Sequence, residues 1–151
     1  MPGLRLSRLF AISLIALSSA CAVKKEVIVG AGAIGTHHSA ALLAAADGNS
    51  PAMDAIFQSE LKSRGFNSVQ GAPAGTKQAA NVDVIVEYVD VWRWDLSMYL
   101  ESISVRFYDP RNGGVIAVAN WGQKDQMFHS YPKPEDVVRE VLSDVFAKVR
   151  R

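Results

Sequence analysis

The sequence predicts an α+β fold, a two-layer sandwich in which two helices cover one face of a mainly antiparallel sheet of three to five strands. Three short apolar segments lie between residues 81 and 121 and are separated by turn residues, as in a β-meander. Two further segments, at residues 51–64 and 134–151, carry apolar residues at helical spacing. Each helix is apolar along one stripe only, and one face of the sheet can bury both stripes.

The strand predicted over residues 82–94 is apolar on both faces. Alternation with a period of two brings together one set of side chains: Val82, Val84, Val86, Tyr88, Trp92 and Trp94. The opposite face carries Ile85, Val89 and Val91 among charged residues. If the helices cover only one face, one of these sets is left uncovered by them. We therefore expect that set to meet the preceding segment, a partner protein, a second copy of the chain or a lipid-like ligand.

The next two apolar segments predict a β-hairpin. Residues 102–108 alternate between apolar and polar side chains, which is typical of a half-buried strand. The sequence Asp-Pro-Arg-Asn-Gly-Gly follows at residues 109–114, where proline fixes φ and Asn-Gly tolerates positive φ. The chain is therefore expected to reverse here and return as a third strand over residues 115–121.

Both predicted helices have recognisable ends. Ser50 can cap the first, Pro51 suits its first position, and Gly65 is typical of the residue that ends a helix. The second begins at Pro134 with acidic residues in its first turn and ends in basic residues, which complements the helix dipole. Its apolar stripe comprises Val137, Val138, Val141, Leu142, Val145, Phe146 and Val149.

Composition excludes several classes of function. The chain has 151 residues and a formal net charge of +1, enough for one domain and without the basic excess of a nucleic-acid binder. Its single cysteine, Cys21, excludes an intramolecular disulfide. The adjacent His37 and His38 point apart on a helix and are remote from His129, so we expect no metal site. No nucleophile motif or Cys-His pair is present, and we expect no enzyme activity, catalytic residue or cofactor.

The first twenty-one residues match a secretory signal. Arg5 and Arg8 precede an apolar run at residues 9–17, which is too short to span a bilayer, and small residues then lead to Cys21. This ending resembles the lipobox of bacterial lipoproteins, although leucine stands four positions before the cysteine rather than the usual three. The alternatives are an ordinary signal peptide cut after Ala20, or a buried helix with a chance cysteine. We expect lipidation of Cys21, with palmitate among the acyl chains.

Lipidation at Cys21 divides the chain into three regions. Residues 1–20 are a signal peptide, residues 21–49 a linker with room for a short strand and helix, and residues 50–151 a single domain. Ala22 stands where aspartate is associated with retention in the inner membrane. The expected location is therefore the bacterial cell envelope, at the periplasmic face of the outer membrane.

The linker contains a match to a dinucleotide-binding fingerprint. Gly30, Gly32 and Gly35 follow the apolar residues 27–29 with the spacing that brings backbone close to a pyrophosphate. The alternative function is accordingly a small NAD(P)-binding oxidoreductase. The context argues against it, because a helix predicted over residues 36–46 is followed by a turn and another helix, not by a second strand ending in an acid.

Three segments together resemble a family of small proteobacterial envelope lipoproteins of unknown function. They are Asp-Val-Ile-Val-Glu-Tyr at residues 83–88, Trp-Arg-Trp-Asp-Leu-Ser-Met-Tyr-Leu at 92–100 and Asp-Pro-Arg-Asn-Gly-Gly at 109–114, within a helix–strands–helix layout that covers residues 50–151. The resemblance implies an envelope location and a binding or structural role. It supplies no catalytic residues.

Aromatic residues provide the candidate binding site. Because Trp and Tyr combine a large apolar area with a polar group, they are favoured at interfaces, although they also build cores. The candidates for a face that meets a partner or ligand are Tyr88, Trp92, Trp94, Tyr99 and Trp121. The sequence therefore predicts a membrane-anchored envelope lipoprotein with a non-catalytic binding or assembly role. Its expected partners are the membrane, through Cys21, and an envelope protein or a second copy of the chain.

Overall fold

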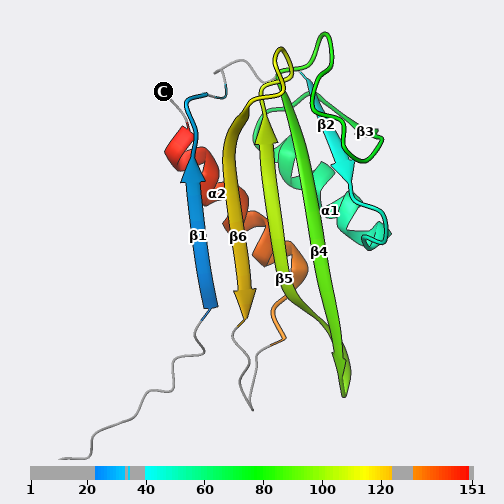
Figure 1. Cartoon of the computed structure of the whole chain (residues 1–151). Coiled ribbons are helices and arrows are strands. Elements are labelled where there is room, and N and C mark those ends of the chain that lie inside the picture. Colours follow the sequence, from blue (N-terminus) through cyan, green and yellow to red (C-terminus); the bar gives the residue numbers. More distant parts are fainter. Residues whose placement is uncertain (1–22, 33, 35–39, 124–130, 150–151) are drawn as a thin grey trace, which may run out of the picture.

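The computed structural model describes residues 23–32, 34, 40–123 and 131–149, which form one six-stranded sheet and two α-helices (Figure 1). The elements are, in chain order, β1 (Val23–Val29), β2 (Ala40–Ala45), α1 (Pro51–Ser63), β3 (Ser68–Ala72), β4 (Val84–Asp95), β5 (Ser97–Tyr108), β6 (Val115–Gln123) and α2 (Pro134–Val149). Both helices lie on the same side of the sheet, α1 against β2 and β3 and α2 against β1 and β6. The mixed helix and strand content is as predicted.

The strand order is β1-β6-β5-β4-β2-β3. β1, β6, β5 and β4 are joined by antiparallel pairings, whereas β2 is parallel to both of its neighbours, β4 and β3. Helix α1 links β2 to β3, so this part of the sheet is a parallel β-α-β crossover. The prediction of three to five strands is too low, because β1 and β2 arise from residues 21–49, which the sequence indicated to be a linker.

Strand β2 corrects the predicted helix over residues 36–46. Its sequence, Ala-Ala-Leu-Leu-Ala-Ala, has high helix propensity, but residues 40–45 pair with β3 on one side and β4 on the other. Ala41, Leu43 and Ala44 are almost completely buried. Two neighbouring ladders satisfy the backbone on both sides, and this tertiary context overrides the local preference. Residues 35–39 lie outside the described residues.

Helix α1 begins and ends where the sequence indicated. Ser50 is extended and Pro51 is the first helical residue. Gly65 adopts φ of 101°, and its N–H donates to the carbonyl oxygen of Lys62 at 3.0 Å. The N–H of Phe66 then reaches the carbonyl oxygen of Leu61 at 3.3 Å, and the Phe66 ring is buried. The positive φ is the reason why glycine suits this position.

The turn between β5 and β6 confirms the predicted hairpin. The N–H of Asp109 donates to the carbonyl oxygen of Gly114 at 2.8 Å, and Gly113 has φ of 72°. The side-chain oxygen of Asn112 accepts from the N–H of Gly114 at 2.7 Å. Proline, asparagine and glycine thus each act in the way that turn chemistry predicts.

The core lies between the helices and the side of the sheet that they cover. All seven apolar residues predicted for the stripe of α2 are buried. The ring of Phe146 on α2 meets that of Phe107 on β5 edge-on, with centroids 6.0 Å apart. Within the described residues, no helix is both long enough and apolar enough to span a membrane.

Candidate binding surfaces

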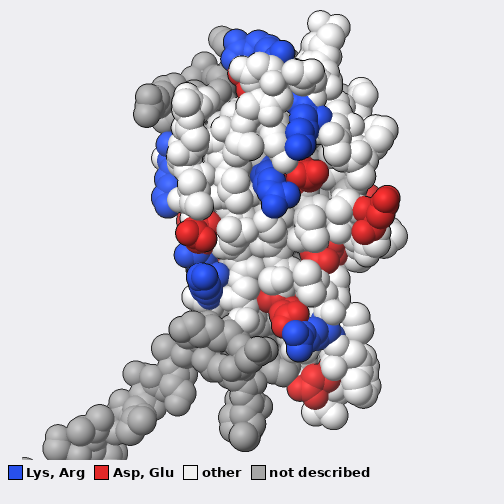
Figure 2. Space-filling view, in the orientation of Figure 1, with Lys and Arg blue, Asp and Glu red and all other residues white. Residues whose placement is uncertain are grey.

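The sheet face opposite the helices, here called the open face, exposes part of its apolar set. Val89 and Val91 on β4 are 36% and 42% exposed, and Ile28 on the edge strand β1 is 54% exposed. Their pairing partners place all three on this face. Figure 2 shows acidic and basic side chains interspersed over the view, with no large area of one sign. The open face can therefore offer scattered apolar contacts to a partner rather than a strong electrostatic attraction.

The loop between β3 and β4 covers the end of the open face nearest the β5–β6 turn. The Nζ atom of Lys77 lies 5.6 Å from the ring centroid of Tyr108, and the N–H of Ala79 donates to the carbonyl oxygen of Pro110 at 3.1 Å. Ile85, which pairs with Tyr108, is buried at this end of the face, as is Tyr108 itself. Of the three apolar residues that the sequence placed on this face of β4, Ile85 is covered and only Val89 and Val91 are available.

Glu87 anchors the polar part of the open face. Its Oε2 atom accepts a hydrogen bond of 2.7 Å from the hydroxyl of Tyr108 and lies 3.4 Å from the guanidinium of Arg106. Burial, together with the hydrogen bond to Glu87, raises the pKa of Tyr108. These groups satisfy one another, so they support the sheet instead of forming a reactive site.

The far end of the β4–β5 hairpin, here called the hairpin end, is the most exposed apolar feature among the described residues. Trp94, Leu96 and Met98 are 72%, 87% and 56% exposed. In Figure 1 the hairpin projects beyond both helices and beyond the other strands. Leu96 turns the chain with φ of 56°, an uncommon conformation for a residue other than glycine. Neither helix reaches these side chains, although Trp94 lies on the helix side of the strand.

Two tyrosines brace the base of the hairpin end. The hydroxyl of Tyr131, which precedes α2, donates to the carbonyl oxygen of Asp95 at 3.0 Å. The ring of Tyr131 also meets that of Tyr99 edge-on at 5.6 Å. Arg93 and Glu101 form an ion pair of 2.7 Å across the hairpin. These contacts hold the hairpin in place, and the side chains of Trp94, Leu96 and Met98 nevertheless stay exposed.

The structure separates the five aromatic candidates. Tyr88 and Trp121 are buried in the core, whereas Trp92 and Tyr99 are partly exposed and Trp94 is largely exposed. The ring of Tyr88 stacks on Phe57 of α1 at 4.3 Å, and its hydroxyl donates to Asp54. Burial and this hydrogen bond raise the pKa of Tyr88. Three of the five, all on the β4–β5 hairpin, therefore remain in a candidate surface.

A buried carboxylate that the sequence analysis did not single out lies beside Tyr88. Asp90 is 8% exposed, and its Oδ2 atom accepts from the N–H of Ser50 at 3.2 Å and from the indole N–H of Trp92. Ser50 makes no side-chain cap of its own, so Asp90 supplies the acceptor at the start of α1. In the sequence, Asp90 could have been recognised as the single acidic residue in the alternating set of core residues on β4. Asp90 fastens the helix to the sheet and leaves Trp92 fixed at the base of the hairpin.

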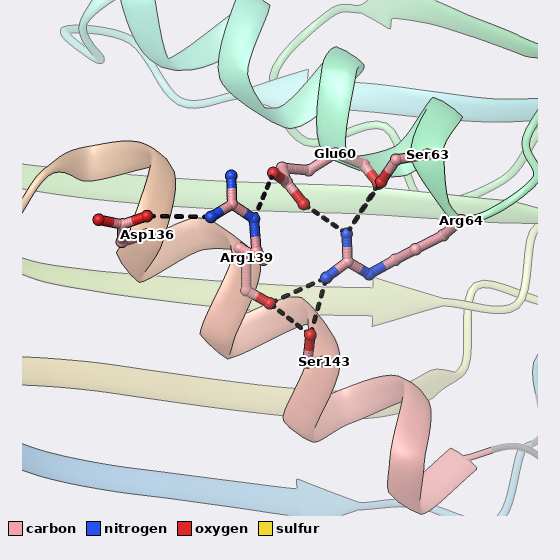
Figure 3. Close-up of polar contacts among 6 residues, drawn as sticks. All are labelled: Glu60, Ser63, Arg64, Asp136, Arg139 and Ser143. Atoms are coloured by element: carbon pink, nitrogen blue, oxygen red, sulfur yellow. Dashed lines mark hydrogen bonds and ion pairs between the residues drawn. The ribbon is translucent and has the colours of Figure 1, made fainter.

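The two helices are joined by a polar network (Figure 3). Glu60 on α1 accepts from Arg64 at 2.6 Å and from Arg139 on α2 at 3.1 Å. The other terminal nitrogen of Arg64 donates to the carbonyl oxygen of Arg139 and the hydroxyl of Ser143, at 2.8 and 2.9 Å. An open pocket lies over these groups. Since both guanidinium groups are engaged by protein acceptors, the network is best explained as a clamp between α1 and α2.

The glycine motif makes contacts that explain its glycines without a nucleotide. The N–H of Gly30 donates to the carbonyl oxygen of Ile116 at 2.7 Å. A Cβ atom at Gly30 would lie 2.4 Å from the carbonyl oxygen of Val115, and one at Gly32 would lie 2.9 Å from the Ile116 side chain. These positions require glycine because the chain passes close to β6. Gly35 lies outside the described residues.

Nothing in the described part of the chain resembles a metal centre. No group of three or more His, Cys, Asp or Glu residues is placed to hold an ion in residues 23–32, 34, 40–123 and 131–149. Cys21, the lipidation candidate, and all three histidines lie outside the described residues.

Comparison with known proteins identifies a fold. No protein-family model matches the chain, and no curated protein matches it either. Among solved structures, the chain is similar to PelC from Paraburkholderia phytofirmans, described as a dodecamer, with a TM-score of 0.57 and 17% sequence identity over 86% of this chain and 99% of that one. A single-substitution variant of that dodecamer gives a TM-score of 0.56 at 17% identity, over 84% and 99% of the two chains. At this identity the likeness defines a shared fold.

Proposed function

We propose that this chain is a lipid-anchored protein of the bacterial envelope with a non-catalytic assembly role. The anchor is the thiol of Cys21, and the location is the periplasmic face of the outer membrane. In this proposal the fold is a two-layer α+β sandwich, in which the helices cover one face of the sheet and a partner binds the other. Support for the anchor comes from the signal-like sequence before Cys21.

The observation that carries the assembly role is the apolar content of the open face. Val89, Val91 and Ile28 are each at least one third exposed on the sheet face that neither helix covers. β1 also forms one edge of the sheet in the described chain, so part of its backbone is available for pairing. A second copy of the chain fits such a surface, because pairing between different patches of identical subunits builds rings or filaments. The PelC chains that share this fold assemble as a dodecamer, which supports the same choice.

Self-association is tested with the chain that begins at Cys21, in solution and with Cys21→Ser to remove the thiol. We expect native mass spectrometry to find oligomers for this protein. The double substitution Val89→Ser and Val91→Ser should shift the distribution toward monomer by weakening apolar contacts. The matched control is Val115→Ser, an exposed valine near the β5–β6 turn and away from the centre of the open face. A monomer at all concentrations, or equal oligomers in all three proteins, would contradict assembly through this face.

The anchor is tested separately in the full chain expressed in a Gram-negative host. Intact mass measurement of the membrane fraction should find a protein that begins at Cys21 and carries acyl chains. Cys21→Ser should give an unmodified chain that leaves the membrane fraction at high salt. Wild-type protein with a free thiol, or with residues 1–20 retained, would refute lipidation without affecting the assembly test.

A further inference from the structure

The hairpin end and the start of β1 lie at the same edge of the sheet. Lys24 pairs with Gly122 of β6, and Gly122 in turn pairs with Ser102 of β5. Lys24 and Ser102 are therefore at the same level along the strands. From Ser102 the β5 strand runs back toward Leu96, and from Lys24 the chain runs back toward Cys21. Figure 1 shows the start of β1 and the projecting hairpin at the same end of the molecule.

Chain length limits how far Cys21 can lie from this level. Cys21 is three residue steps from Lys24, and even a fully extended chain spans no more than about 11 Å over that distance. The hairpin end is five residue steps beyond the Val91–Ser102 pair, counted along β4 to Leu96, which is roughly 17 Å of strand. Along the strand direction, Leu96 thus lies at least roughly 6 Å beyond Cys21. This result does not depend on the path of the residues between Cys21 and β1.

The side chains at the hairpin end suit the boundary between lipid headgroups and acyl chains. Tryptophan is enriched at this boundary, and peripheral proteins bury apolar groups about 5–10 Å into it. Trp94, Leu96 and Met98 supply one aromatic and two flexible apolar side chains, all largely exposed. Arg93 is neutralised by its ion pair with Glu101 at the base of the hairpin. This insertion depth is similar to the distance by which Leu96 extends beyond Cys21 along the strand direction.

A protein partner fits the hairpin end less well. A stable protein interface buries about 800 Å² on each side, over a broad surface. Here three side chains project from the narrow end of a two-stranded ribbon, with the exposed Asp95 between Trp94 and Leu96. The Arg93–Glu101 ion pair lies behind them. A lipid leaflet accepts such a shape without a complementary pocket, because its acyl chains rearrange around the inserted groups.

We propose that the hairpin end inserts Trp94, Leu96 and Met98 into the membrane leaflet that holds the lipid on Cys21. This inference rests on the anchor of the proposed function. Two attachment points, the lipid and the hairpin end, set the strands upright on the membrane. In that orientation the open face is turned sideways, parallel to the normal of the bilayer, where neighbouring anchored copies can reach it.

The test uses the chain that begins at Cys21, which retains every described element, and the fact that Cys21 is its single cysteine. The thiol is coupled to a maleimide-headgroup lipid in vesicles of phosphatidylethanolamine and phosphatidylglycerol, so natural lipidation is not needed. Tryptophan emission is then measured with brominated acyl chains in the vesicles, which quench indoles at that depth. We expect quenching in the wild-type protein and loss of most of it in Trp94→Phe, which removes the reporter.

A second variant blocks insertion but keeps the reporter. Leu96→Asp with Met98→Asp places two charges at the hairpin end, and we expect it to lose the quenching while Trp94 is retained. The matched control, Val89→Ser with Val91→Ser, alters two exposed apolar residues away from the hairpin end and should be quenched like wild type. Circular dichroism and thermal unfolding verify that each variant folds. No quenching in wild type, or equal quenching in all four proteins, would overturn the proposal, whereas the masses that test lipidation and assembly are unaffected.

Discussion

The two faces of the sheet differ in what completes them. On the helix side, Phe57 of α1 stacks on Tyr88 of β4, Phe146 of α2 meets Phe107 of β5, and every predicted apolar position of α2 is buried. On the open face, Ile85 is buried at the end where a loop lies over Tyr108, while Val89 and Val91 stay partly exposed, although all three belong to the same alternating set. The comparison teaches that alternation assigns a residue to a face but does not determine whether that face is covered. Burial depends on which remote segment folds over each position.

The comparison predicts unequal costs for truncating one side chain on each face. Phe57→Ala removes the ring that stacks on Tyr88 in the core and should lower the free energy of unfolding by about 3–5 kcal/mol. The loss combines the transfer of the ring with the cavity that it leaves. Urea unfolding followed by far-UV circular dichroism measures it. A loss below about 1 kcal/mol would mean that the helix side is less tightly packed than the structure indicates.

The helix side should also respond to alkaline pH through Tyr88. Its hydroxyl donates to Asp54, and burial with this hydrogen bond raises the pKa of the folded state. The fold therefore favours the neutral phenol, and this stabilisation is complete below the ordinary tyrosine pKa of about 10 and is lost as the pH rises above it. Tyr88→Phe should cost about 1–2 kcal/mol near pH 8, because the hydrogen bond is lost.

The pH dependence of Tyr88→Phe tests the role of the Tyr88 hydroxyl more specifically than its cost near pH 8. Between about pH 9 and 11, the free energy of unfolding should fall less steeply in Tyr88→Phe than in wild type. Part of the slope should persist, because burial and Glu87 also raise the pKa of Tyr108 on the open face. Urea midpoints across this range test the difference, and parallel pH profiles would show that Tyr88 ionises as freely in the folded chain as in the unfolded one.

The smallest effect is expected on the open face. Val91→Ser changes a residue that is 42% exposed on a surface without a covering layer, so it should alter the free energy of unfolding by no more than about 0.5 kcal/mol. The same substitution on the helix side, Val86→Ser, places a hydroxyl at a fully buried position and should cost several times more. Thermal unfolding of the matched pair measures the contrast. Equal costs would indicate that the open face is covered in the isolated chain.

The sequence by itself determined the features that depend on neighbouring residues. Ser50, Pro51 and Gly65 mark the ends of α1, residues 109–114 form the predicted turn, and alternation assigned the side chains of β4 correctly to two faces. Capping, turn geometry and side-chain period act over a few residues, so their signals are written in short stretches of sequence.

Two features were decided only by the tertiary structure. They are the presence of residues 40–45 in the sheet and the exposure of particular aromatic side chains. Residues 40–45 favour a helix locally but form β2, because the backbone pairs with β3 and β4. Trp92 and Trp94 share one face of β4, yet Trp94 extends past the helices and is 72% exposed. Strand pairing and coverage join residues far apart in the chain. No local pattern in β4 therefore encodes how far along the strand a remote helix covers it. The hairpin end, and with it the proposed contact with the membrane, exists because β4 and β5 are longer than the layer that covers them.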